Sequence, residues 1–233
     1  MTVLKKYTNV MSGTSYSTKR RNYRPGKIRE ANQLRIISAA EQEFVVHGFK
    51  GATVNNIALR AELPKANIHY YFKSKLDLYA AVLENILSLW DDTFNELCAE
   101  DDPGIVLKEY IHAKVMFSQT NPLASRIFAK EIISGGEHLS QFFQQDYRDW
   151  FNDRAGVFCD WVALGKMDPV DPIHLIFMIW STTQHYADFS PQICAALGKK
   201  SLTNADFQKA ADTLSTIILK GCGIQLPNAT STE

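Results

Sequence analysis

A short stretch after Pro64 concentrates side chains that suit the base edges of a duplex nucleic acid. In chain order it carries Lys65, Ala66, Asn67, His69 and Tyr70. The Asn67 carboxamide offers a donor and an acceptor side by side, which matches adenine, and the small Ala66 lets a thymine methyl approach. Nearby ammonium and hydroxyl groups suit the phosphates, which position a protein without specifying sequence: Thr53, Lys65, Tyr71 and Lys75.

A second constellation lies far along the chain, where Trp180 and Gln184 are four residues apart. On a helix this spacing places both side chains on one face. An indole stacks on flat rings, and a carboxamide both donates and accepts, so the pair suits a small planar ring that bears an amide. Spacing alone favours a plainer interpretation, in which Trp180 fills the core and Gln184 satisfies a backbone group or faces a partner subunit.

Charge is divided unevenly along a chain whose formal net charge is zero. Residues 1–72 hold twelve Lys and Arg against four acids, a net of +8, and residues 73–233 hold thirteen against twenty-one, a net of −8. Such asymmetry indicates a basic end directed at a polyanion and an acidic body that avoids one. Composition alone equally allows a solvated basic tail, because residues 5–27 supply seven positive charges and no acid.

The elements that must position these side chains follow a helical period almost throughout. Apolar residues recur at three- and four-residue steps from Ile36 to Val45, and Gly48 ends that helix. Thr53 and Ser74 are N-cap candidates, and Pro64 suits a first helical turn. Further helices are predicted at residues 53–61, 65–72, 74–98, 105–119, 123–134, 138–164, 168–188 and 203–221. Because no stretch alternates apolar and polar residues persistently, the predicted class is all-α.

Composition also bounds the compartment. The four cysteines form no CxxC pair, so they indicate reduced thiols rather than a disulfide framework or a zinc site. No signal peptide is visible at the N-terminus, and the longest clean apolar run, residues 175–180, is far shorter than the roughly 20 residues that span a bilayer. We therefore expect a soluble, cytoplasmic protein with no membrane partner.

Three short helices followed by a long one, with a turn at residues 62–64, form the layout of a helix-turn-helix. The second helix of such a pair enters the major groove of DNA and offers its N-terminal residues to base edges. Here that helix begins at Lys65. A purely structural helical protein would leave the basic helix and the charge asymmetry unexplained.

The same residues resemble the signature of the TetR family of repressors. The match runs through Thr53-xxx-Ile57-Ala58-xx-Ala61-x-Leu63-Pro64-Lys65-Ala66-Asn67-Ile68-His69-Tyr70-Tyr71-Phe72-Lys73-Ser74-Lys75-xx-Leu78. Two positions depart from it, since Glu62 stands where many members carry Gly and Pro64 where many carry a capping Ser. These departures weaken the local signals of the turn but leave the residues that frame it intact.

The resemblance implies a homodimer that places two reading helices in successive major grooves of a near-palindromic operator. It also implies a pocket for a small-molecule effector in each subunit and a dimer interface built from C-terminal helices. We accordingly predict three parts. They are a flexible basic arm over residues 1–27, a three-helix bundle with the helix-turn-helix over 28–74, and a larger C-terminal helical domain for ligand binding and dimerisation over 75–233.

Within that family, the C-terminal part is similar to the pyrimidine-utilisation repressors, the RutR group. The similar stretches are ILSLW ending at Trp90, ASR at 124–126, LIFMIW at 175–180 and TQHYADF at 183–189. That group responds to uracil and thymine, so the resemblance implies a pyrimidine effector bound by Trp90, Trp180 and Gln184. Two indoles and one carboxamide suit a ring edge of alternating C=O and N–H groups.

Two alternatives stay open beside this one. A TetR-type regulator of another hydrophobic ligand, such as a drug or fatty acid, would need an oily tunnel. Such a tunnel could be lined by Phe94, Phe117, Phe128 and Met178, although residues of this kind at helical spacing are more often simply core.

A helical enzyme is the more distant alternative. The six histidines form no pair with the spacing of a metal site on a helix, and we expect neither a metal nor a cofactor. His185 and Asp188 lie three residues apart, as a base and its orienting group would, but no nucleophile stands on a strand-turn-helix beside them. The sequence therefore predicts a ligand-responsive transcriptional regulator, a repressor by resemblance, and no enzyme.

Overall fold

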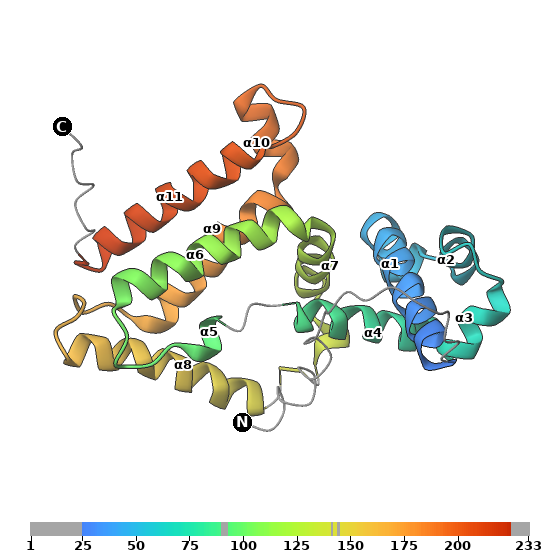
Figure 1. Ribbon diagram of the computed structural model, residues 1–233, viewed down its shortest axis with the longest axis horizontal. Coiled ribbons are helices and arrows are strands. Elements are labelled where there is room, and N and C mark those ends of the chain that lie inside the picture. Colours follow the sequence, from blue (N-terminus) through green and yellow to red (C-terminus); the bar gives the residue numbers. More distant parts are fainter. Residues whose placement is uncertain (1–24, 90–92, 141, 144, 225–233) are drawn as a thin grey trace, which may run out of the picture. The chain divides into compact units, whose positions relative to one another are not determined.

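The computed structural model describes residues 25–89, 93–140, 142–143 and 145–224, and every regular element within these ranges is a helix (Figure 1). This confirms the predicted all-α class. By its contacts the chain divides into two units, residues 1–90 with 127–139 and residues 91–126 with 140–233. The predicted basic arm over 1–27 lies almost wholly outside the described residues. The boundaries at 27 and 74, which divide the chain by task, stay predictions.

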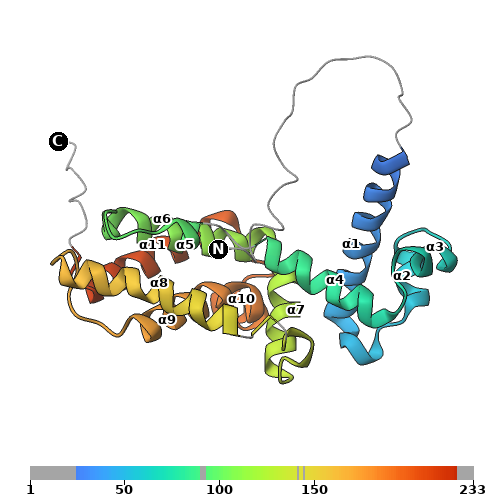
Figure 2. The same ribbon diagram turned by 90° about the horizontal axis from the view of Figure 1, so that it is seen from below.

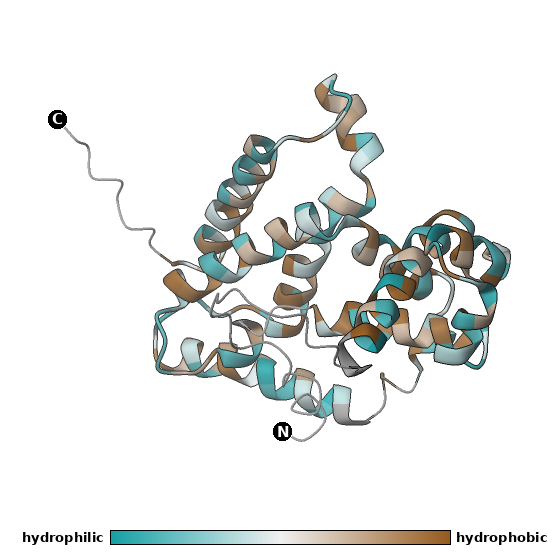
Figure 3. Cartoon of the chain, turned by 45° about the vertical axis from the view of Figure 1, so that its right-hand side comes forward, coloured by the Kyte–Doolittle hydropathy of each residue, from teal (hydrophilic) through white to brown (hydrophobic). Residues whose placement is uncertain are grey.

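The first unit is built on four helices: α1 (Pro25–Gly51), α2 (Val54–Arg60), α3 (Lys65–Tyr71) and α4 (Lys75–Ser88). The apolar stripes of α1, α2 and α4 meet in a core that includes Ile36, Phe44, Ile57, Leu78 and Val82, each at most 1% exposed. Figure 3 shows hydrophobic and hydrophilic residues alternating along the helices of the chain, as amphipathic helices require. Burial of these stripes, rather than intrinsic propensity, stabilises helices as short as α2 and α3.

Local signals fix the ends of these helices. Thr53 accepts a hydrogen bond from the Asn56 backbone N–H at 3.1 Å, and Ser74 accepts one from the Asp77 N–H at 3.0 Å, so both predicted N-caps are confirmed. Gly48 ends the first helical segment as the sequence predicts, since its φ of 66° lies in the left-handed region, and a second short helical segment follows it to Gly51.

The end of α7 (Pro122–Ile133) and a 3₁₀ turn at Glu137–Leu139 also belong to the first unit. Glu131 is 5% exposed, and its carboxylate accepts hydrogen bonds from the Tyr79 hydroxyl at 3.0 Å and from the His138 backbone N–H at 2.8 Å. Burial and the Glu131 charge both raise the pKa of Tyr79, which keeps its hydroxyl a donor. These bonds tie residues 127–139 to α4.

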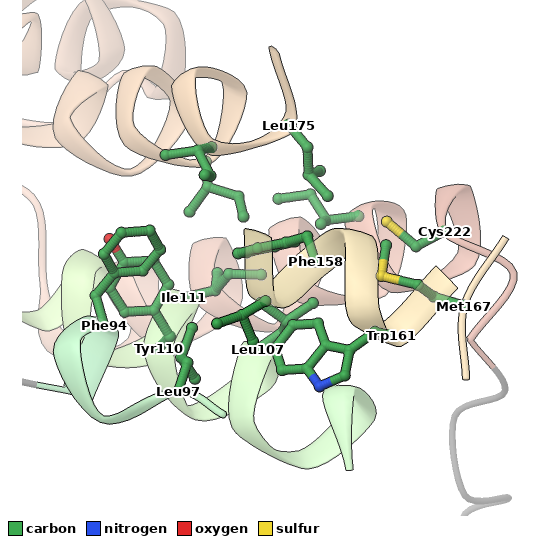
Figure 4. Close-up of a cluster of buried hydrophobic side chains, with 14 of the residues drawn as sticks. Phe94, Leu97, Leu107, Tyr110, Ile111, Phe158, Trp161, Met167, Leu175 and Cys222 are labelled. Atoms are coloured by element: carbon green, nitrogen blue, oxygen red, sulfur yellow. The ribbon is translucent and has the colours of Figure 1, made fainter. Parts of the chain in front are cut away.

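The second unit contains α5 (Thr93–Glu96), α6 (Pro103–Thr120), α8 (Gln145–Ala163), α9 (Pro172–Asp188), α10 (Ser190–Leu197) and α11 (Asn204–Gly221). The helix α6 packs against both α9 and α11, and α8 lies along α9 (Figure 2). Figure 4 shows the core between them, where Leu107, Ile111, Phe158 and Trp161 are at most 1% exposed. None of the helices described in either unit combines the length and apolar composition needed to cross a bilayer.

Two predicted helices were too long. The helix predicted over residues 74–98 ends at Ser88, the short helix α5 covers Thr93–Glu96, and residues 97–101 are not helical. Carbonyl groups of residues 95–101 accept hydrogen bonds from side chains far along the chain. Arg154 donates to the Asn95 and Leu97 carbonyls, Trp161 to that of Cys98, and Lys166 to those of Ala99, Glu100 and Asp101.

The helix predicted over residues 138–164 begins only at Gln145. Gly135 and Gly136, both at positive φ, end α7, and a short 3₁₀ turn follows them. One helix was not predicted at all. This helix, α10, begins at Ser190 and carries Pro191 in its first turn.

Candidate functional site

The turn between α2 and α3 is held in a conformation that most side chains disfavour. Glu62 has φ 49°, in the left-handed region that favours glycine. Its backbone N–H donates to the Leu59 carbonyl at 3.0 Å, and the Arg35 guanidinium of α1 pairs with its carboxylate. The position at which the family resemblance expects glycine therefore does require that backbone conformation, and an ion pair to α1 helps to hold it.

Helix α3 presents most of its predicted reading residues to solvent. Only Ile68 of its seven residues is buried, at 1% exposure, and it packs into the core of the first unit. Lys65, Ala66, His69 and Tyr70 are exposed and Asn67 is half-buried. Pro64 at the N-cap makes no side-chain hydrogen bond, so the N–H groups of the first turn receive no cap from this position.

Tyr71 faces back toward the first helix. Its hydroxyl oxygen accepts a hydrogen bond from the Asn32 carboxamide at 3.3 Å, and its ring meets that of Tyr70 edge to face at 5.2 Å. The bond from Asn32 leaves the Tyr71 hydroxyl proton available to a phosphate. The contact also fixes the side of α3 on which Tyr70, 73% exposed, projects.

Two predicted phosphate contacts already have partners within the protein. The Thr53 oxygen caps α2, which leaves its hydroxyl proton free to donate. The Lys75 ammonium donates to the Lys50 carbonyl at 3.3 Å and the Ala52 carbonyl at 3.0 Å, and it lies 4.8 Å from the centre of the Phe49 ring. Lys75 therefore stabilises the end of α1 and keeps one N–H for a phosphate.

A buried acid that the sequence analysis did not single out supports the helix-turn-helix. Glu43 of α1 is 1% exposed and accepts a hydrogen bond from the Asn56 carboxamide at 2.9 Å. The Arg60 guanidinium lies 3.5 Å from the same carboxylate, so both ends of α2 are tied to α1. The sequence did carry a signal for this buried acid, because Glu43 stands directly before Phe44 on the apolar face of α1.

In the second unit, Trp180 and Gln184 lie one turn apart on α9 and both are half-buried. The indole N–H of Trp180 donates to the Tyr110 hydroxyl at 2.6 Å. The Gln184 carboxamide makes no hydrogen bond to any residue that the structure describes. Trp90 lies outside the described residues, and its predicted role stays a prediction.

Aromatic rings surround the Trp180 indole on several sides. Phe94 of α5, Phe151 of α8 and Phe177 of α9 each meet it edge to face, with centroid distances of 5.9, 5.7 and 5.9 Å. Such contacts add to the stabilisation from buried area. Among the described residues, the rings packed on Trp180 are therefore aromatic, and the Tyr110 hydroxyl is bonded to its indole N–H.

One turn beyond Gln184, two residues of α7 hold the end of α9. Ser125 donates to the Asp188 carboxylate at 2.7 Å, and Arg126 donates to the Ala187 carbonyl at 2.9 Å and to the Ser190 hydroxyl at 3.0 Å. Burial raises the pKa of Asp188, while the Ser125 bond and the charge of Arg126 act in the opposite direction. A cation at the C-terminus of a helix is favourable, so Arg126 fixes the end of the helix that carries Gln184.

The residues considered for an oily tunnel differ in burial. Phe94 is 4% exposed and belongs to the core, whereas Met178 is 43% exposed. His185 stacks on Phe189 at 4.7 Å, and the Asp188 carboxylate accepts a hydrogen bond from Ser125. The described residues contain no group of three or more His, Cys, Asp or Glu side chains that could hold a metal ion.

Two family models match consecutive parts of the chain. The model for bacterial regulatory proteins of the tetR family matches residues 36–82, which include α2 and α3. The model for the C-terminal region of YcdC-like proteins matches residues 83–225, which include α9.

Named proteins agree with these family models. The chain is 38% identical to the HTH-type transcriptional regulator RutR of Escherichia coli strain K12 over 191 residues, which cover 82% of this chain and 90% of that protein. It is 27% identical to the HTH-type transcriptional repressor NicS of Pseudomonas putida over 78% of this chain and 86% of that protein.

Solved structures support the same fold. A TetR-like transcriptional regulator from Rhodococcus sp. RHA1 matches with a TM-score of 0.60 at 19% identity, over 88% of this chain and all of that one. The hemolysin II transcriptional regulator HlyIIR matches with a TM-score of 0.57 at 22% identity, over 79% of this chain and 97% of that one.

Proposed function

Because the chain belongs to the TetR family of bacterial transcriptional regulators, we propose that it binds a near-palindromic operator as a homodimer and responds to a pyrimidine base. The family fixes the general activity, which is helix-turn-helix DNA binding and regulation of transcription. The operator symmetry, the dimer, the effector and the residues that contact each are our inferences.

The placement of α3 carries the DNA part of the proposal. A helix of seven residues with one buried anchor, Ile68, and exposed Lys65, Ala66, His69 and Tyr70 presents a polar face suited to a groove. Asn67 is the residue that we assign to adenine, and Thr53, Tyr71 and Lys75 to phosphates. The positive charge of residues 1–72 supports the same assignment, because phosphate contacts release counterions.

This assignment is tested by the salt dependence of duplex binding. We expect an affinity for a random-sequence duplex that falls steeply between 50 and 200 mM salt. A duplex selected by the protein from a random pool should bind at least about 10³-fold more tightly than a random one. An affinity independent of salt would contradict the proposed interface.

The Gln184 carboxamide, which has no hydrogen-bond partner among the residues that the structure describes, carries the effector part of the proposal. Since Tyr110 takes the indole N–H, Trp180 offers a ligand its ring but no further conventional hydrogen-bond donor. Gln184 must then supply the polar pairing, and its C=O and NH₂ match adjacent N–H and C=O groups of uracil or thymine. Trp90, three residues before α5, is the proposed second stacking surface.

A thermal-shift screen tests the effector. Uracil and thymine should raise the unfolding temperature of the protein, since a ligand that binds only the folded state stabilises it. N3-methyluracil, whose paired edge is blocked, should give no shift because the Gln184 amide would lose its partner. Equal shifts with uracil and N3-methyluracil would count against Gln184 as the pairing group.

The aromatic cluster around Trp180 favours one second candidate, a larger hydrophobic effector such as a drug or fatty acid. Phe94, Phe151 and Phe177 give this region the apolar surface that such a ligand needs. A shift with fatty acids and none with nucleobases would favour this candidate. The DNA part of the proposal is independent of that outcome.

A further inference from the structure

We propose that Tyr110 is a positioning residue for effector recognition, because its hydroxyl fixes the orientation of the Trp180 indole on which the effector stacks. The proposal rests on the proposed function, in that it assumes a ligand beside Trp180. The geometry that carries it belongs to the protein alone. Neither the spacing of Trp180 and Gln184 nor the family resemblance pointed to α6 as a source of site residues.

Tyr110 is itself held firmly. It is 2% exposed in the core of the second unit, at the centre of α6. Its ring stacks on that of Phe94 with centroids 4.9 Å apart and an angle of 27°, and Figure 4 shows the two rings against each other. A hydroxyl on a ring held in this way has a fixed position, so it is a rigid acceptor.

The hydrogen bond from Trp180 transmits that rigidity to α9. The Trp180 Nε1 to Tyr110 hydroxyl distance is 2.6 Å, and it joins residues seventy positions apart in the chain. Edge-to-face packing against Phe94, Phe151 and Phe177 confines the indole plane. The hydrogen bond is directional, so it selects one orientation of the ring among those that packing allows.

A second consequence concerns selectivity. With its N–H bonded inside the protein, the indole presents an apolar face to the effector, and polar discrimination falls to Gln184. Tyr110 and Gln184 therefore have separable tasks. Loss of Tyr110 should weaken every stacked ligand to the same extent, whereas loss of Gln184 should remove the distinction between uracil and N3-methyluracil.

The first test needs no ligand. In a ¹⁵N-labelled full-length protein, the Trp180 indole N–H signal, assigned with Trp180→Phe, should lie downfield as expected for a hydrogen-bonded proton. Tyr110→Phe should move it upfield and broaden it. Tyr147→Phe is the matched control, because Tyr147 lies in the same aromatic cluster, 5.5 Å from Trp150 and 6.3 Å from Phe151, and no hydrogen bond joins it to Trp180. This control should leave the Trp180 signal unchanged.

The second test is a double-mutant cycle on uracil affinity measured by calorimetry. Tyr110→Phe should weaken uracil and thymine binding by the same factor, about three- to tenfold, as for one lost hydrogen bond. In a Trp180→Phe background, Tyr110→Phe should have no further effect, because the hydroxyl acts through the indole. A residue with a purely structural role would weaken binding equally in both backgrounds.

The outcomes separate the two proposals. If the wild type binds no uracil, the pyrimidine proposal fails, and the indole signal still decides whether Tyr110 positions Trp180. If uracil binds and Tyr110→Phe changes neither the indole signal nor the affinity, the positioning role is overturned. An equal loss of affinity in both backgrounds, with an unchanged indole signal, overturns it as well.

Discussion

The two proposed sites of this protein hold their candidate side chains in opposite ways. In the proposed DNA-reading site, Lys65 and Tyr70 project from a helix of seven residues that buries only Ile68. In the proposed sensing site, Trp180 is half-buried among three aromatic rings and bonded to Tyr110. A duplex is a large surface that exposed groups can reach, whereas a small ring must be enclosed before a few polar contacts can select it.

The difference extends to what supports each site. The reading helix is too short to be stable alone, and polar contacts to α1 hold its surroundings: the Asn32 bond to Tyr71, the Arg35 pair with Glu62 and the Glu43 network beneath α2. The sensing helix is supported by an apolar core that includes Trp161 and Phe158. Changes to the sensing core should therefore cost more folding free energy than any single change at the reading surface.

The largest effect is expected from Trp161→Ala. Its indole is fully buried and donates to the Cys98 carbonyl at 3.0 Å, so the substitution should lower the free energy of unfolding by about 3–5 kcal/mol. Chemical denaturation followed by circular dichroism measures this loss. Leu164→Ala, close to the end of α8 at 60% exposure, is the control and should change the value by no more than about 0.5 kcal/mol. Similar losses in the two variants would contradict this description of the core.

A smaller and more specific effect is expected at the reading surface. Asn67→Ala should cost about 1–3 kcal/mol on the selected duplex and leave binding to random duplexes unchanged. Lys65→Ala should weaken all duplexes alike and lower the slope of log affinity against log salt by about one. Lys209→Ala, an exposed lysine on α11, should change neither. If Asn67→Ala leaves sequence discrimination intact, α3 is not the reading helix in the way proposed.

The helix-turn-helix could be predicted from the sequence because its signals are local. The caps at Thr53 and Ser74 and the anchor Ile68 follow from spacing within a few residues. The supporting network could not be placed in the same way. Whether Glu43 meets Asn56 and Arg60 depends on how α1 packs against α2, which no local pattern specifies.

The sensing site shows the same limit more strongly. The spacing of Trp180 and Gln184 predicted a shared face of α9, and both do lie on that helix. The hydrogen bond from Trp180 to Tyr110 could not be predicted, because Tyr110 lies seventy residues away on another helix. The non-helical segment at residues 97–101 was not predicted for a related reason. Side chains far along the chain, Arg154 and Lys166, donate hydrogen bonds to carbonyl groups in and next to this segment.

The smallest expected effect is a change in pH dependence at the end of α9. Burial raises the pKa of Asp188 above its unfolded value, so the folded state holds this proton to higher pH. The stability contributed by that proton is fully present below the unfolded pKa and is lost as pH rises through the folded pKa. Asp188→Asn should remove this downward slope. Denaturation midpoints measured from pH 3 to 7 test the sign of this pH dependence. If the wild type and Asp188→Asn show the same change of stability with pH, the assignment to Asp188 is contradicted.

The most direct test of the whole account is a titration of the selected duplex with uracil, followed by fluorescence anisotropy, for the wild type and Gln184→Leu. We expect uracil to change the apparent duplex affinity of the wild type and N3-methyluracil to leave it unchanged. Gln184→Leu should bind the duplex like the wild type and respond to neither. A variant that still responds to uracil, or a wild type that responds equally to both compounds, would contradict the claim that α3 reads DNA under the control of a pyrimidine bound at Gln184.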